Sequence, residues 1–191
     1  SGLAVASCSA AWSKRSIPIS PYIMSAMSGN RCPVPRRVGI VHKVASAEAT
    51  ETAVFVAQFL RNRGMEVFTD EEEVGRAADL VVVLGGDGTL IHAQSLLGGR
   101  PVPILGVNMG SLGFMTEVPQ NRLYDALELV LAGKAKVSQR MKLRVHLHKG
   151  GTPERALDAE VLNDVVIAKS ALSRMAELDM RCSGDYVTTY K

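Results

Sequence analysis

The sequence predicts an α/β protein, with a doubly wound parallel-sheet domain followed by a β-rich, incomplete C-terminal domain. Three observations support this fold class. From Arg37 onward, short β-branched runs alternate with stretches of helical periodicity, which is typical of a parallel sheet with crossover helices. The run at 79–84 is apolar throughout its centre, as expected for a strand covered on both faces. Near Gln139 polar and apolar residues begin to alternate, which favours antiparallel strands with one solvated face.

The first domain, residues 37–137, is expected to alternate strands with helices. The expected strands are 38–41, 65–68, 79–84 and 102–107, and the expected helices are 48–63, 88–97 and 120–131. Gly64 and Gly133 follow the first and third of these helices, and glycine readily adopts the left-handed conformation that ends a helix. The acidic run Glu71-Glu72-Glu73 is interpreted as a solvated loop.

The second domain, residues 138–191, is expected to be built from short strands. These are 142–148, 160–168, 175–181 and 186–190, with turn-forming residues at 149–153 and 182–185. The sequence ends at Lys191 with an open strand edge, so we expect a fragment of a longer protein. An unfinished sheet also favours pairing with another chain, and a homo-oligomer is therefore expected.

Residues 1–36 are predicted to be a disordered leader. Residues 1–37 contain eight serines, four prolines and five basic residues but no acidic residue. Such a segment buries too little apolar surface to offset the entropy lost on ordering. Its composition is also typical of an organelle transit peptide, which makes an organelle the alternative location. The cytoplasm is the main expectation, because the three cysteines form no paired pattern.

The charge balance argues against nucleic acid as a partner. The chain has 22 basic and 19 acidic residues, a net charge of +3, but residues 38–191 carry 17 basic and 19 acidic residues, a net −2. A protein that grips nucleic acid needs a dense cationic face. A membrane partner is also not expected, because no apolar run approaches the roughly 18 residues that cross a bilayer. Small-molecule nucleotides remain the expected partners.

The segment most informative about chemistry is Gly85-Gly86-Asp87-Gly88-Thr89, where a buried strand passes into a helix. Glycines let a ligand approach the backbone, and the N-terminus of a helix attracts phosphate oxygens. The spacing fits neither the Walker nor the G-x-G-x-x-G pattern. A carboxylate here repels phosphate unless Mg²⁺ bridges the two or the carboxylate faces an attacking hydroxyl. The alternative is a plain strand-to-helix turn in which Asp87 only caps the helix.

A second glycine-bearing loop, Asn108-Met-Gly-Ser-Leu-Gly-Phe-Met-Thr116, follows the next strand. Ligands bind at this edge of such sheets. The GGDGT segment is common to NAD kinases, lipid kinases and phosphofructokinases, but the second loop and Leu162-Asn163-Asp164-Val-Val-Ile167 together resemble NAD kinases. The resemblance extends from about Arg37 to Lys191. The family's later motifs, an Asp-Gly pair and a Thr/Ser/Gly-rich segment, are absent from this sequence.

This resemblance implies an enzyme that transfers a phosphoryl group from ATP, with Mg²⁺ or another divalent cation, to the 2′-hydroxyl of the adenosine ribose of NAD, giving NADP. Asp87 matches the proton acceptor of the family, and Gly88 lies beside it in the binding loop. The same likeness implies nucleotide contacts at His92, Phe114, Asn163, Asp164, Arg174 and Lys191. No side chain is assigned as a metal ligand, and the truncated chain is expected to be inactive if the missing motifs are needed.

Each of these residues also has a purely structural interpretation. Asn163 and Asp164 fit a polar bulge in a strand, Arg174 an exposed strand residue and Lys191 a frayed terminus. Phe114 fits a core position and His92 a helix surface. Two alternative functions stay open at this point. One is a lipid kinase that shares GGDGT, and the other is a non-catalytic, dinucleotide-binding fragment.

Overall fold

The computed structural model describes residues 6–8, 23–24, 32–110, 113–140, 142–148, 155–162, 165–166 and 178–190. The chain divides into two compact units. The first extends to Arg140, and the second begins at Met141 and includes strand β1 (Ala6–Cys8). Within the described residues, no helix is both long and apolar enough to span a membrane.

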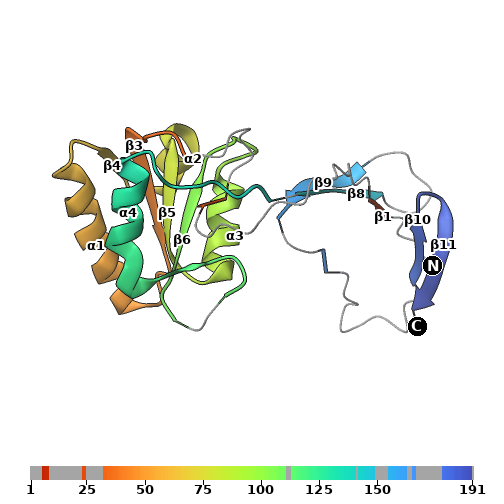
Figure 1. Ribbon diagram of the computed structural model, residues 1–191. Helices are drawn as coiled ribbons and strands as arrows, with labels where there is room; N and C mark the ends of the chain where they lie inside the picture. The colour runs from red at the N-terminus through yellow and green to blue at the C-terminus, as the bar shows by residue number, and fades with distance from the viewer. Residues whose placement is uncertain are drawn as a thin grey trace. The chain divides into compact units, whose positions relative to one another are not determined.

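The first unit is built on a parallel sheet with the strand order β6-β5-β3-β4 (Figure 1). These strands are β3 (Arg37–His42), β4 (Glu66–Phe68), β5 (Leu80–Gly85) and β6 (Ile104–Asn108). Strand β7 (Val118–Pro119) extends the sheet parallel to β6, and β2 (Ile23–Met24) pairs antiparallel with β6. All six residues of β5 are buried, which confirms the prediction of a central strand covered on both faces.

Helices cover both faces of this sheet, so the predicted doubly wound architecture is confirmed. Helices α1 (Ala47–Arg61) and α4 (Leu123–Leu131) lie on one face, and α2 (Glu71–Ala77) and α3 (Asp87–Leu96) lie on the other (Figure 1). One core cluster joins the first pair to the sheet and includes Val56 and Leu60 of α1 and Leu127 of α4. On the opposite face, a Cβ on Gly39 would come within 2.7 Å of Val74, so glycine permits the close approach of α2.

Helix α2 corrects the prediction that 71–73 form a loop. The Asp70 side chain caps the helix by accepting a hydrogen bond from the Glu73 N–H at 3.1 Å. The three glutamates occupy the first turn, where negative charge interacts favourably with the helix dipole. The acidic run is therefore a helix start, and its charge pattern follows from that position.

The strand order places a topological switch point between β3 and β5. From β3 the chain moves to β4 on one side, and through β5 it moves to β6 on the other. The crossover loops diverge at the carboxyl ends of these two strands, where ligands bind in open α/β sheets. The GGDGT segment begins at the end of β5, so it lies at this edge.

Of the predicted leader, residues 1–36, the structure describes residues 6–8, 23–24 and 32–36. Strand β1 pairs with β8 (Leu143–His148), and β2 pairs with β6, each within its own unit. Cys32 is only 2% exposed in the core, and its N–H donates to the Ala135 carbonyl at 2.9 Å. Burial, followed by the charge of Asp79, raises the pKa of the Cys32 thiol to about 11, so the thiol is held in its unreactive protonated form.

The described part of the second unit consists of two antiparallel assemblies. Strand β8 (Leu143–His148) pairs with β1 and with β9 (Arg155–Val161), and β10 (Leu178–Cys182) forms a hairpin with β11 (Asp185–Tyr190). The hairpin turn has positive φ at Ser183 and Gly184, as the sequence predicts for 182–185. The strand predicted at 160–168 agrees with the structure only at residues 160 and 161, which end β9. Residues 162, 165 and 166 lie in no strand, and 163–164 and 167–168 lie outside the described residues.

Candidate active site

The three glycines of the GGDGT segment have different structural requirements. A Cβ on Gly85 would collide with the side chain of Thr89, so helix α3 can begin directly after β5 only if position 85 is glycine. A Cβ on Gly86 or Gly88 would have no heavy atom within 4 Å, and neither residue has a positive φ. Neither packing nor backbone conformation therefore requires glycine at 86 or 88. The open space beside them leaves room for a ligand at the start of α3, where the amides of Asp87 and Gly88 precede the first hydrogen bonds of the helix, from Thr89 and Leu90 to the Gly86 carbonyl.

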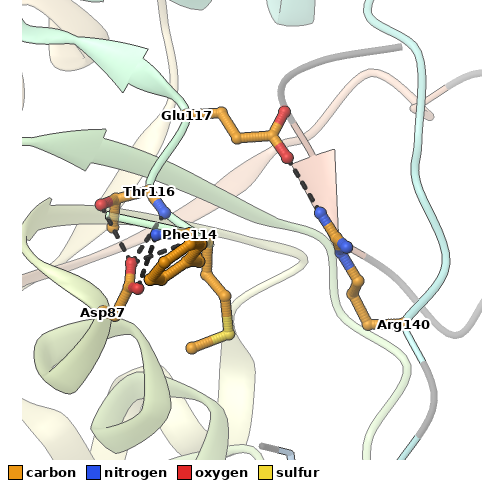
Figure 2. A network of polar contacts seen from close by, with 6 residues as sticks. Asp87, Phe114, Thr116, Glu117 and Arg140 are labelled. Carbon is orange, nitrogen blue, oxygen red and sulfur yellow. Dashed lines mark hydrogen bonds and ion pairs between the residues drawn. The ribbon is translucent and has the colours of Figure 1, made fainter. Parts of the chain in front are cut away.

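Asp87, the first residue of α3, points toward the loop that follows β6 (Figure 2). Its Oδ2 accepts a hydrogen bond from the Phe114 N–H at 2.8 Å. Its Oδ1 accepts three, from the Met115 N–H at 3.0 Å, the Thr116 N–H at 3.0 Å and the Thr116 hydroxyl at 3.2 Å. The carboxylate thus joins the two glycine-bearing loops at the carboxyl edge of the sheet.

The pKa of Asp87 reflects two opposing effects. Burial alone would raise the pKa of the carboxyl, but the hydrogen bonds from Phe114, Met115 and Thr116 lower it below the ordinary value of 3.8. The lowered pKa keeps Asp87 ionised at neutral pH. An ionised carboxylate can accept a proton but cannot donate one, so the chemistry available to Asp87 here is that of an acceptor.

The loop opposite Asp87 also depends on a glycine. A Cβ on Gly113 would overlap the Asp87 Oδ1 and would lie 2.6 Å from the Thr116 Oγ1. The loop is recognisable as a motif in the sequence, but no role is predicted there for Gly113, Met115 or Thr116. The structure shows that Thr116 is fully buried, and a buried hydroxyl must find its hydrogen-bond partner within the protein.

An open cavity of about 850 Å³ adjoins the same loop. It is bounded by the carboxyl ends of β6 and β7 and the first turn of α1, and its lining includes Glu48, Asn108, Gly110, Glu117 and Gln120. Glu48 accepts a hydrogen bond from Gln120 at 2.8 Å, and Glu117 forms an ion pair with Arg140 at 2.9 Å (Figure 2). Both carboxylates of the lining are therefore engaged. The cavity does not include Asp87, but the segment from Asn108 to Glu117 borders both.

Comparison with known proteins identifies the group that this chain resembles. The chain is 42% identical over 170 residues to an NAD kinase of Geotalea daltonii, covering 82% of this chain and 59% of that protein. It is 50% identical over 135 residues to an NAD kinase of Geobacter metallireducens, covering 71% of this chain and 47% of that protein. Residues 69–135 match the ATP-NAD kinase N-terminal domain. The chain is similar to NAD kinases over most of its length.

A solved structure supports the fold independently. The crystal structure of yeast NADH kinase complexed with NADH superposes with a TM-score of 0.70 at 20% sequence identity, covering 81% of this chain and 51% of that one. The resemblance to NAD kinases predicted from GGDGT and the following loop is confirmed by the curated relatives, and the solved structure confirms the fold class. The chain spans 47 to 59% of the length of the two curated NAD kinases.

Four of the residues that the NAD kinase likeness implicates can be placed. Asp87 and Gly88 open helix α3, and Phe114 is 94% exposed, so its ring is outside the core. His92 lies on α3 and contacts Glu71 of α2, with 2.8 Å between Nε2 and Oε1. The geometry brings Asp87 and Phe114 together through one hydrogen bond, whereas His92 pairs with α2. Asn163, Asp164, Arg174 and Lys191 lie outside the described residues.

The described residues contain no group of three or more His, Cys, Asp or Glu side chains that could hold a metal ion. The four hydrogen bonds that Asp87 accepts also leave its carboxylate with little capacity for a cation. The donor set of this part of the chain therefore fits a metal that arrives with nucleotide phosphates better than a resident metal held by carboxylates.

Proposed function

We propose that the protein is an NAD kinase that transfers the γ-phosphoryl group of ATP to the 2′-hydroxyl of the adenosine ribose of NAD, giving NADP and ADP. One observation carries the proposal: an ionised carboxylate, Asp87, lies between two glycine-bearing loops at the switch point of the sheet. The curated relatives, at 42 and 50% identity, are NAD kinases. No observation favours a lipid kinase.

In the proposed reaction the ribose oxygen forms a bond to the γ-phosphorus while the bond from that phosphorus to the ADP oxygen breaks. The hydroxyl proton passes to Asp87 as the new bond forms, because a carboxylate with a pKa below 3.8 is too weak a base to remove it beforehand. Such a general base contributes roughly 10² to 10⁴ in rate. The remaining acceleration has to come from holding the phosphoryl group in line and stabilising its charge.

The open backbone at Gly86 and Gly88 is the proposed cradle for the donor phosphates. The amides at the start of α3 point to the same edge of the sheet as the Asp87 carboxylate, and the helix dipole favours negative charge there. Mg²⁺, when bound with the nucleotide, would neutralise charge on the phosphoryl oxygens. Phe114, exposed beside Asp87, is the proposed platform for the adenine ring.

A coupled assay tests this function in the full-length protein. Protein, Mg-ATP and NAD are mixed, and NADP is detected with an NADP-specific dehydrogenase. We expect NADP to form with the wild type and turnover to fall by at least about 10²-fold in Asp87→Asn. Binding of NAD without any NADP would favour the non-catalytic alternative. Near-normal turnover in Asp87→Asn would remove Asp87 from the mechanism.

The assembly and location of the protein are also proposals. Open strand edges support a homo-oligomer, which light scattering on the full-length protein would test, with a monomer as the contradicting result. The cytoplasm is the proposed compartment. A fluorescent fusion that carries residues 1–36 and localises to an organelle would instead support the transit-peptide alternative.

A further inference from the structure

The two oxygens of the Asp87 carboxylate have unequal numbers of hydrogen-bond donors. Oδ1 accepts from the amides of Met115 and Thr116 and from the Thr116 hydroxyl, whereas Oδ2 accepts only from the Phe114 amide. An ionised carboxylate offers about four lone-pair positions in total. Oδ1 is therefore saturated, and the free acceptor position lies on Oδ2.

We propose that Thr116 is a positioning residue for phosphoryl transfer: its amide and hydroxyl, together with the Met115 amide, occupy Oδ1 and leave Oδ2 of Asp87 as the atom that receives the ribose proton. This inference rests on the proposed function. Thr116 is 0% exposed, so its hydroxyl has no access to water and bonds to Oδ1 without competition from solvent. The neighbouring Phe114 is 94% exposed, so the loop is open to solvent next to the amide that binds Oδ2.

Gly113 enables this arrangement. Because position 113 has no Cβ, Oδ1 can lie against the backbone and accept all three donors. The resulting orientation fixes both χ angles of Asp87, since the carboxylate plane is defined by bonds to both oxygens. A fixed carboxylate loses little entropy when the substrate hydroxyl approaches, which is the advantage of a preorganised site.

In the described part of the chain, the hydrogen bonds from residues 114–116, and not charged side chains, set the electrostatic environment of the Asp87 carboxylate. The effects on its pKa are burial and the hydrogen bonds from residues 114–116. His92, on the same helix, pairs with Glu71 of α2. Glu117, next to Thr116, points toward Arg140 and pairs with it (Figure 2). A change in the Thr116 hydroxyl should therefore act on Asp87 directly.

The test replaces Thr116 with valine, which keeps the shape of the side chain and removes the hydroxyl. Loss of one hydrogen bond to the ionised form should raise the pKa of Asp87 toward its ordinary value. In the full-length protein we expect the acidic limb of kcat/KM to move to higher pH. We also expect kcat to fall several-fold while KM for NAD stays within about twofold. Thr116→Ser should restore the wild-type profile.

Thr52→Val is the matched control, because the Thr52 hydroxyl donates to the Glu48 carbonyl within α1 and not to Asp87. It should leave the pH profile unchanged. An unchanged acidic limb in Thr116→Val, or a raised KM for NAD at an unchanged pH profile, would overturn the proposal. If Thr116→Val fails to fold, Thr116→Ala removes the same donor and carries the same expectation.

Two readouts separate this inference from the proposed function. Titration of the Asp87 carboxyl carbon by NMR, assigned from its absence in Asp87→Asn, should show the same upward shift in Thr116→Val whether or not the protein makes NADP. No shift overturns the role of Thr116 alone, whereas normal NADP formation by Asp87→Asn overturns the proposed role of Asp87 and, with it, proton transfer to Oδ2. In a crystal with bound NAD, the ribose 2′-oxygen should lie on the Asp87 oxygen that Thr116 does not contact. The opposite placement contradicts the assignment of Oδ2.

Discussion

The Asp87 carboxylate has a structural effect that is separate from any chemistry it performs. It holds the loop after β6 against the start of α3 through four hydrogen bonds, three of them from backbone amides. An asparagine in its place turns an NH₂ group toward donors that need an acceptor. Loss of turnover in Asp87→Asn is therefore informative only when NAD binding and the unfolding free energy are measured on the same variant.

A functional role for Asp87 is a prediction from the sequence that no observation yet tests, whereas the hydrogen-bond partners of Asp87 could not be predicted. A carboxylate among four small or polar neighbours in GGDGT is unusual because it opposes phosphate binding, and this indicated a function. Its hydrogen-bond donors are mostly backbone amides, which every residue except proline possesses, so they leave no mark on the sequence. Only Gly113 and Thr116 are residue-specific, and neither forms a pattern without knowledge of the contact.

Gly113 and Gly88 provide a matched pair of glycine substitutions. Gly113→Ala places a methyl group against the Asp87 Oδ1, so the loop or the carboxylate must move. We expect a loss of about 1 to 3 kcal/mol in unfolding free energy and a large loss of turnover. Gly88→Ala meets nothing within 4 Å in α3, so we expect unchanged stability or a gain of up to about 1 kcal/mol.

For the proposed cradle, Gly88→Ala should still raise KM for the nucleotides about tenfold, because the methyl group occupies the space in which phosphates approach. Urea unfolding and steady-state kinetics on both variants check the pair. Equal stability of the two variants would contradict the observed contact at Gly113. Unchanged kinetics in Gly88→Ala would contradict the cradle.

At the scale of elements, the sequence predicts those helices and strands whose apolar pattern extends over many residues. The buried strand β5 and the helices α1 and α4 were recognised because each presents a clear apolar run or periodicity. Helix α2 was missed because its seven residues include only one buried position, Val74, and an internal glycine. That glycine, Gly75, allows close approach to Leu96 of α3, since a Cβ there would lie 2.5 Å from the Leu96 carbonyl oxygen.

The bounds of strand β9 could not be predicted for a different reason. The predicted strand at 160–168 is more apolar than the observed Arg155–Val161, but pairing with β8 decides where the strand lies. The register runs from Leu143 opposite Val161 to His148 opposite Arg155, with a shift at the far end. Cross-strand pairing is a long-range property, and β-propensity of a segment does not determine it.

Asp70 offers a test of how α2 begins. At the start of α2, the Asp70 side chain accepts a hydrogen bond from the Glu73 N–H. Near its end, the Arg100 side chain donates hydrogen bonds to the Gly75 and Ala78 carbonyls at 2.6 Å. Asp70→Ala should lower the unfolding free energy by about 1 kcal/mol, whereas Asp70→Ser should change it by only a few tenths. Urea denaturation measures both. An equal loss in the two variants would show that the cap does not act through its hydrogen bond.

At the scale of the whole molecule, the fold class and the likeness to NAD kinases were predictable because their signals are redundant. Strand and helix alternate across the first unit, and two glycine-bearing loops occur at the carboxyl ends of adjacent strands. The second unit gave a weaker signal, because short antiparallel strands depend on partners that are distant in sequence. The substrate contacts predicted at 163–164, 174 and 191 remain predictions that fall outside the described residues.

Binding and chemistry can be separated at this scale by linkage between NAD binding and unfolding. A ligand that binds only the folded protein stabilises it by RT ln(1 + [L]/Kd), so each tenfold rise in NAD above Kd adds about 1.4 kcal/mol to the unfolding free energy. We expect this slope in the wild-type full-length protein and also in Asp87→Asn, because the proposed contacts of the dinucleotide include residues other than Asp87. Chemical denaturation at several NAD concentrations measures it.

Nicotinamide mononucleotide is the control ligand, because it lacks the adenosine ribose whose hydroxyl is proposed to face Asp87. It should stabilise the protein less than NAD does at the same concentration. Equal stabilisation by the two ligands would mean that the adenosine half contributes nothing to binding, and the ribose could not then be held against Asp87. A slope in the wild type that disappears in Asp87→Asn would place Asp87 in ground-state binding and would conflict with a role confined to proton transfer.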